Sequence, residues 1–213
     1  ASTGKMAWYF QASPHDTQDR DANESIVLFD AEFKGRPRKL LAQASRNGYY
    51  FLLDRATGES LVSAEFGPQN WSAGLNRRGE PIPKPEKDPQ IAGSLFHGSG
   101  TNWWSPSYSP MTKLFYVNAH EHWMVSYLTL DEQNEEKASD HQGGANTALW
   151  SQSMLLALDY ETGKVRWRRD RPNAENREAA GQGSGILTTA GGLLFTGDPT
   201  GDLVALDAES GKT

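Results

Sequence analysis

Hydrophobic and polar residues alternate over short stretches of this 213-residue chain. Residues 202–206, for example, read Asp-Leu-Val-Ala-Leu, and many such runs end at Gly, Pro, Asn or Asp. A period of two predicts strands with one buried face, and we find no long stretch with the 3.6-residue period of an amphipathic helix. We therefore expect an all-β protein. The clearest predicted strands are residues 25–29, 38–42, 49–53, 114–119, 124–128, 154–158 and 193–196.

A sequence motif recurs along the chain. Residues 157–167 read ALDYETGKVRW, and residues 205–213 read ALDAESGKT. Residues 1–8, ASTGKMAW, match the second half of the motif, and residues 53–59, LDRATGE, are a weaker copy. In this pattern a strand ends at Asp, and the chain turns at a Gly that can adopt positive φ. The Trp that follows is then placed to cover a neighbouring unit.

The spacing of the motif predicts the architecture. Its glycines lie at positions 4, 58, 163 and 211, separated by 54, 105 and 48 residues. Counting the middle interval as two periods gives about four units, and a period of roughly 50 residues with several strands is typical of a β-propeller. Because the copies at both ends are incomplete, we expect residues 1–213 to be part of a larger propeller domain. Residues 68–93, 131–148 and 168–182 are predicted insertions that shape an entrance on one face.

Composition excludes several classes of function. The formal net charge of −6 argues against a nucleic-acid partner, which usually meets a basic surface. The absence of cysteine excludes disulfides, thiolate catalysis and cysteine metal sites within this stretch. No run of about 18 apolar residues is present, so no membrane-spanning helix is expected.

The densest polar cluster is residues 13–21, Ser-Pro-His-Asp-Thr-Gln-Asp-Arg-Asp. Its three carboxylates, Asp16, Asp19 and Asp21, repel one another unless a cation binds or one of them holds a proton. The cluster follows the aromatic segment Trp8-Tyr9-Phe10-Gln11, so a strand is expected to lead into a loop at the end of a blade. A solvated acidic turn is the alternative interpretation. An EF-hand is disfavoured because Glu24 stands where its loop needs Gly.

Three segments together resemble the PQQ-dependent (quinoprotein) alcohol dehydrogenases, the methanol and ethanol dehydrogenase family. Residues 8–21 are similar to that family's pattern W-x-x-Q-x-[ST]-P-H-D-x-x-D-x-D. Residues 38–58 and 100–117 match the next two segments in the family's order, so the resemblance spans essentially the whole chain. It implies an eight-bladed propeller in the full protein, of which about four blades lie here on the C-terminal side.

The resemblance also implies a reaction and its residues. The family oxidises a primary alcohol by hydride transfer to pyrroloquinoline quinone (PQQ) beside a Ca²⁺ or lanthanide ion. Asp19 matches the general base and metal neighbour, Asp21 a further metal ligand, and Arg46 and Asn102 contacts to PQQ. Expected partners are a small alcohol, a cytochrome c-type electron acceptor and the remainder of the propeller, in a periplasmic or secreted location. The isolated segment is expected to be inactive, because other metal ligands of the family precede it.

Departures and alternatives bear on these assignments. Gln18 replaces the Trp usual before the catalytic Asp, and Arg20 replaces an aromatic residue after it, which changes the shape of the pocket. Arg46 favours the alcohol-oxidising branch, since related sugar dehydrogenases carry Lys there. A PQQ-dependent sugar dehydrogenase and a non-catalytic propeller scaffold remain the alternatives. His120 and His122 alternate along a predicted strand, and we expect an exposed strand end rather than a metal pair.

Overall fold

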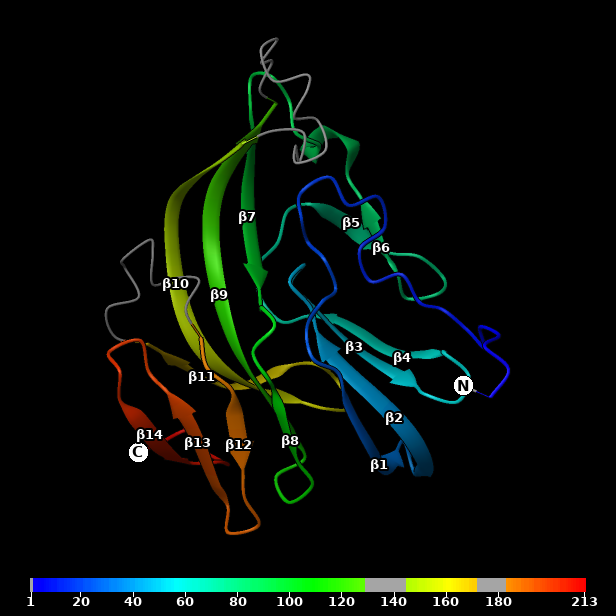
Figure 1. Ribbon diagram of the computed structural model, residues 1–213, viewed down its shortest axis with the longest axis vertical. Helices are drawn as coiled ribbons and strands as arrows, with labels where there is room; N and C mark the ends of the chain where they lie inside the picture. The colour runs from blue at the N-terminus through cyan, green and yellow to red at the C-terminus, as the bar shows by residue number, and fades with distance from the viewer. Residues whose placement is uncertain (1, 129–144, 172–182) are drawn as a thin grey trace.

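The computed structural model describes residues 2–128, 145–171 and 183–213, in which nearly all regular structure is β-strand (Figure 1). The strands form three antiparallel sheets in succession and one short hairpin. In chain order they are β1 (Val27–Phe33), β2 (Arg36–Ala44), β3 (Tyr49–Asp54), β4 (Ser60–Glu65), β5 (Ser72–Leu75), β6 (Pro81–Pro83), β7 (Ser94–Gly100), β8 (Ser107–Ser109), β9 (Leu114–Tyr127), β10 (Ala145–Asp159), β11 (Val165–Asp170), β12 (Ile186–Thr188), β13 (Leu193–Gly197) and β14 (Leu203–Asp207).

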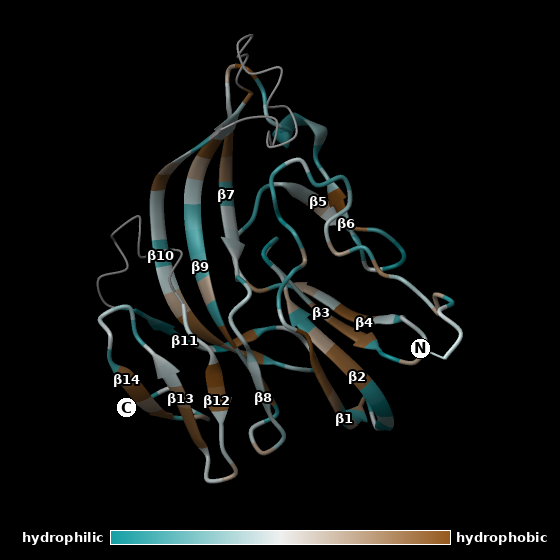
Figure 2. Ribbon diagram, in the orientation of Figure 1, coloured by the Kyte–Doolittle hydropathy of each residue, from teal (hydrophilic) through white to brown (hydrophobic). Residues whose placement is uncertain are grey.

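The first sheet is a four-stranded meander in the order β1-β2-β3-β4, the usual form of a propeller blade. Its third strand, β3, is buried along its whole length because both faces of the sheet are covered. Alternate β3 residues therefore enter different cores, with Tyr50 and Leu52 on one face and Tyr49, Phe51 and Leu53 on the other. Figure 2 shows the apolar character of β3.

The second sheet repeats the meander as β8-β9-β10-β11 and adds β7 beside β9. Strands β9 and β10 are long and curved, paired from Leu114 opposite Asp159 to Tyr127 opposite Ala145 (Figure 1). The predicted strands 114–119 and 124–128 are thus parts of one strand, because pairing with β10 continues through the polar residues between them.

The third sheet, β12-β13-β14, corresponds to the first three strands of the same meander. The all-β propeller prediction is confirmed, but the interval from Gly58 to Gly163 does not contain two blades in the described residues. It contains one, lengthened by the β5–β6 hairpin, by a 3₁₀ turn at Pro85–Lys87 and by β7. Residues 68–93, expected to form an entrance insertion, hold that hairpin and turn, while most of 131–148 and 168–182 lies outside the described residues.

The repeated motif forms the turn that follows the third strand of each sheet. At Asp54, Asp159 and Asp207 the backbone carbonyl accepts a hydrogen bond from the motif glycine, at 2.8 Å in every copy. The Asp carboxylate accepts a second bond from a backbone N–H of the turn, as from Ser210 to Asp207 Oδ1 at 2.8 Å. The motif therefore closes itself locally, as expected of an Asp-x-x-[ST]-Gly turn.

The motif tryptophans cover turns of the following units, as the sequence predicts. Trp8 lies on Gly58 and donates from Nε1 to the Arg55 carbonyl at 3.2 Å. Trp167 lies on Gly211 and donates to the Ala208 carbonyl, also at 3.2 Å. A β-carbon on either glycine would stand within 3 Å of the indole, so the close approach requires glycine.

The blades pack face to face through alternate residues of their inner strands. One core, between the first and second sheets, includes Leu52, Phe115 and Leu156, and Tyr50 crosses it to donate to the Tyr160 carbonyl at 3.1 Å. The core between the second and third sheets is composed of Leu114, Tyr116, Leu155, Ala157, Ile186, Leu194, Leu206 and Ala208. Burial on both faces explains why these strands read as near-continuous apolar runs.

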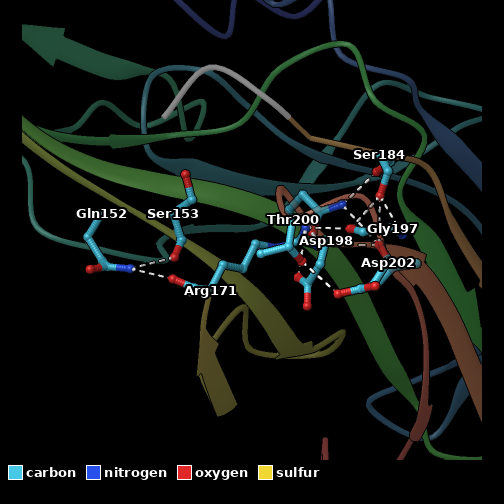
Figure 3. A network of polar contacts seen from close by, with 10 residues as sticks. Gln152, Ser153, Arg171, Ser184, Gly197, Asp198, Thr200 and Asp202 are labelled. Carbon is cyan, nitrogen blue, oxygen red and sulfur yellow. Dashed lines mark hydrogen bonds and ion pairs between the residues drawn. The ribbon is translucent and has the colours of Figure 1, made fainter. Parts of the chain in front are cut away.

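A buried arginine joins the second sheet to the third (Figure 3). Arg171, 5% exposed, donates from Nη1 to the Gly197 carbonyl at 2.5 Å and pairs with Asp198 at 3.4 Å. Its Nη2 donates to Asn118 on β9. The guanidinium of Arg171 thus contacts both blades, so polar contacts as well as the apolar core hold the second and third sheets together.

In the described ranges, no helix has the length and apolar composition needed to cross a membrane.

Candidate active site

The acidic segment 13–21 forms an ordered loop beside the first two sheets. The Asp16 carboxylate accepts hydrogen bonds from the backbone N–H groups of Gln18 at 3.0 Å and Arg20 at 2.6 Å. Asp16 therefore holds the loop together rather than facing the cavity described below. Asp19 has φ of 58°, a left-handed conformation that costs a non-glycine residue about 1 kcal/mol. Such strain is frequent where a side chain must point in a set direction.

A hairpin tip is tied to this loop. Asn47, between β2 and β3, is buried and donates from Nδ2 to the Ala12 carbonyl at 2.7 Å and to Ser13 Oγ at 3.1 Å. The preceding residue, Arg46, places its Nη2 3.4 Å from Asp19 Oδ2. The acid and the guanidinium, 27 residues apart in sequence, thus form an ion pair.

The third segment follows β7. Thr101 donates from its hydroxyl to the Ala44 carbonyl at 2.8 Å, which fixes this segment against β2. Gly100 lies directly on the Arg46 carbonyl, where a β-carbon would collide. Asn102 comes next, and its Oδ1 accepts a bond from the Trp103 backbone N–H at 2.9 Å. This self-capping bond uses the amide oxygen and leaves the amide N–H₂ as a donor.

The three segments enclose one cavity of about 250 Å³. Asp19, Arg46 and Asn102 all line it, as the resemblance requires of residues that meet around one cofactor. The other lining side chains include Arg20, Trp71, Phe96, His97, His120, His122 and Met124. An acid, a permanent cation, an amide and an aromatic wall therefore face the same space, although they come from distant parts of the chain.

Asp21 lies apart from that cavity. Its side chain is exposed and lines a neighbouring depression together with Asp16, Asp19 and Asp88. Within the described ranges, no three His, Cys, Asp or Glu side chains are placed to hold a metal ion together. Asp19 and Gln18 border both spaces, and among the described residues Asp19 is the carboxylate that could face both the cavity and a cation in the depression.

The histidines of β9 line the cavity, so the prediction of an exposed strand end is wrong. His120 and His122 lie opposite Gly100 and Gly98 of β7, which have no side chains to fill the space. Their Nδ1 atoms are buried and have no hydrogen-bond partner within the described part of the chain, and burial lowers the pKa of His120 to about 3 and of His122 to about 4. Both rings are therefore neutral at pH 7. The sequence contains these glycines but does not show which strand they face.

Arg20 also faces the cavity. Its guanidinium lies 4.7 Å from the centre of the Trp71 ring and 5.0 Å from that of Phe96. Burial is the main cause that lowers its pKa to about 10, so it remains charged at neutral pH. The resemblance marks this position only as a departure from an aromatic residue. That the Arg20 side chain points into the cavity is seen only in the folded structure.

Glu24 lies behind Arg46. It is 5% exposed and accepts a weak hydrogen bond from Ser45 Oγ at 3.4 Å, while its Oε1 atom has no partner among the residues of the described ranges. Burial raises its pKa to about 7, although the Arg46 charge acts in the opposite direction. No sequence pattern distinguishes this glutamate from the exposed acids near it.

The described sheets form an all-β propeller segment, and a polar cavity lies between its loops and strands β7, β9 and β10. Residues 1–75 match the family model described as "Glucose/ethanol/alcohol dehydrogenase, beta-propeller domain". Residues 146–213 match a second model, "Outer membrane protein assembly factor BamB". The first match contains Asp19 and Arg46. The second covers the C-terminal repeats, which contain none of the predicted site residues.

Relatives in sequence and structure agree with the first model. The 1-butanol dehydrogenase (cytochrome c) of Thauera butanivorans is 31% identical over 228 residues, covering 99% of this chain and 32% of that protein. The quinohemoprotein alcohol dehydrogenase of Comamonas testosteroni is 31% identical over 229 residues, covering 99% and 31%. The solved structure of quinohemoprotein alcohol dehydrogenase ADHIIG from Pseudomonas putida superposes with a TM-score of 0.82 at 26% identity, covering 98% of this chain and 33% of that one.

The chain is therefore a segment of a quinoprotein alcohol dehydrogenase-like β-propeller. It spans about a third of the length of the relatives it matches.

Proposed function

We propose that residues 1–213 form part of a PQQ-binding propeller domain whose protein oxidises a primary alcohol. The observation that supports this most directly is the cavity shared by Asp19, Arg46 and Asn102. PQQ is a planar quinone with several carboxylates, and the cavity offers a guanidinium, an amide and an aromatic wall. This donor set fits such a group. When bound, PQQ would supply the acceptor for the hydride of the alcohol.

Each residue has a separate role in this proposal. Asp19 takes the hydroxyl proton of the substrate as general base. Arg46 donates hydrogen bonds to the quinone from a planar, positively charged guanidinium, which stabilises negative charge on its oxygens. Asn102 uses its amide N–H₂ to hold the quinone, since its oxygen is already bonded to Trp103 N. The neutral His120 and His122 close the wall without adding charge.

A hard cation, Ca²⁺ or a lanthanide ion, would take carboxylate oxygens from Asp19 and Asp21. Two acids do not complete its coordination sphere, so further ligands would come from other parts of the protein. The proposal also includes a cytochrome c-type electron acceptor, as in the name of the Thauera relative, and a periplasmic or secreted location.

The decisive experiment compares Asp19→Asn with Asp30→Asn in the full protein loaded with PQQ and Ca²⁺ or La³⁺. Both changes are isosteric, but Asp30 is an exposed carboxylate on β1 that lines neither the cavity nor the depression beside it. We expect Asp19→Asn to lower kcat by about 10²- to 10⁴-fold and Asp30→Asn to leave it within about threefold. Equal effects would contradict the role of Asp19. Anaerobic titration with PQQ, read by absorbance, should show weaker binding in Arg46→Gln.

One alternative is supported by a specific observation. The C-terminal repeats match the BamB model, so a non-catalytic propeller is the second candidate. Absence of PQQ binding by the full protein would favour it. Turnover of sugars in preference to primary alcohols would instead favour a sugar dehydrogenase. For residues 1–213 alone we expect no turnover, and dye reduction by this segment with added PQQ and metal would contradict that expectation.

A further inference from the structure

One cation in the cavity, Arg20, has no counter-ion among the described residues. Arg46 has Asp19 at 3.4 Å. Arg20, its neighbour in the same cavity, has no carboxylate oxygen within 4.0 Å among the residues that the structure describes. Asp16 and Asp88 raise the pKa of Arg20 through electrostatic attraction, but their carboxylate oxygens lie more than 4.0 Å from its guanidinium. Arg20 is therefore a largely buried charge without an ion-pair partner in this part of the chain.

The guanidinium of Arg20 is held in place, but the described residues accept few of its hydrogen bonds. The faces of Trp71 and Phe96 orient its plane, and such cation–π contacts restrict rotation while leaving the N–H edge free. In the described residues its side chain makes one hydrogen bond, from Nη2 to the neutral Gln18 Oε1 at 2.6 Å. A guanidinium carries five N–H donors, so most of its capacity remains for a ligand.

The backbone directs Arg20 and Asp19 into the same space. Adjacent residues of an extended chain place their side chains on opposite sides. Here the positive φ of Asp19 breaks the extended geometry, and both side chains line the cavity. A ligand that meets the Asp19 carboxylate with one end is therefore within a few bonds of the Arg20 donors.

We propose that Arg20 binds a carboxylate on the substrate, so that the preferred substrates are hydroxy acids, with the hydroxyl at Asp19 and the carboxylate at Arg20. This inference rests on the proposed function. A planar guanidinium matches a carboxylate in geometry and charge, and the pairing removes the cost of an unpaired buried cation. Phe96 and Met124 provide apolar surface for the methylene groups between the two polar ends.

The test uses two substrates of nearly equal shape, 4-hydroxybutyrate and 1-butanol, which differ by a carboxylate in place of a methyl group. In the full protein with PQQ and metal, Arg20→Met should lower kcat/KM for 4-hydroxybutyrate by about 10- to 100-fold. For 1-butanol the change should stay within about threefold. Arg20→Lys should recover part of the loss. Arg78→Met is the control, because Arg78 also stacks on an aromatic ring, Tyr9 at 4.7 Å, but lies outside the cavity.

A second readout does not depend on turnover. Calorimetric binding of butyrate to the PQQ-free full protein should weaken by the same factor in Arg20→Met and stay unchanged in Arg78→Met. The full protein could bind butyrate through Arg20 and yet oxidise no alcohol. That result would contradict the proposed function and still support the carboxylate site. Equal losses on both substrates, or weaker binding of PQQ itself in Arg20→Met, would overturn the inference and assign Arg20 to the carboxylates of the quinone.

Discussion

Replacing Gly58 by Ala tests the contact by which one unit covers the next. Gly58 has φ of +76°, and a β-carbon there would lie 2.6 Å from Trp8 Cδ2. Gly35, in the β1–β2 turn, has almost the same φ, +75°, but a β-carbon on it would meet nothing within 4 Å. Gly35→Ala therefore measures the backbone penalty alone, about 1 kcal/mol.

Gly58→Ala adds the displacement of the indole to that penalty. Forcing a methyl group into packed surroundings costs about 1–3 kcal/mol, and the Trp8–Arg55 hydrogen bond contributes about 1 kcal/mol. We expect the free energy of unfolding to fall by about 3–5 kcal/mol in Gly58→Ala and by about 1 kcal/mol in Gly35→Ala. Urea unfolding followed by circular dichroism measures both. Equal losses would refute the reasoning, because they would show that the indole moves aside at no cost.

Three further changes probe groups described above. Glu24→Gln should gain about 3 kcal/mol of stability relative to wild type as pH rises from 4.5 to 7, because the unfolded wild type ionises over this range while the folded protein, with a pKa raised to about 7, keeps its proton; urea unfolding at several pH values measures this. Arg171→Met should cost about 3–5 kcal/mol by leaving Asp198 unpaired, measured as a lower unfolding midpoint. Asn47→Ala should cost about 2 kcal/mol and free the acidic loop at Ala12, visible as faster amide exchange there.

Each of these has an outcome that contradicts it. The sign for Glu24 follows from linkage: the folded state retains its proton between pH 4.5 and 7, so wild type loses stability over this range while Gln does not. A pH-independent difference would show that Glu24 is ionised in the folded protein. For Arg171, the double change with Asp198→Asn should recover part of the loss. No recovery would mean that packing, not charge, dominates there. Unchanged amide exchange at Ala12 in Asn47→Ala would show that the loop is held by other contacts.

Sequence patterns predicted the fold class and the repeat because both depend on local rules. The Asp-x-x-[ST]-Gly turn reads the same in three copies, and the two copies with Trp behave alike in space. The count of blades could not be predicted from spacing, since an interval of 105 residues fits two periods as well as one blade with insertions. Long pairing between β9 and β10, a tertiary effect, also joined two predicted strands.

Part of the lining of the cavity was expected from the sequence. Asp19, Arg46 and Asn102 were identified by resemblance, and the cavity brings them together. The roles of His120 and Arg20 could not be predicted, because they depend on which strand lies opposite and on one residue with positive φ. Contacts of this kind arise only when distant segments pack, and a single sequence contains no local signal that is sufficient to identify them.

The tryptophan contacts give the propeller a direction. Trp8 covers a turn of the unit after it, and Trp167 does the same one step further along, so dependence runs from each unit to its successor. If one unit unfolds, the turn of the next unit loses the tryptophan that covers it. The turn of the previous unit stays covered, because its tryptophan comes from a unit further towards the N-terminus. Local unfolding of one blade is therefore expected to spread towards the C-terminus more readily than towards the N-terminus. The near-symmetric arrangement of blades in a propeller does not by itself show this asymmetry.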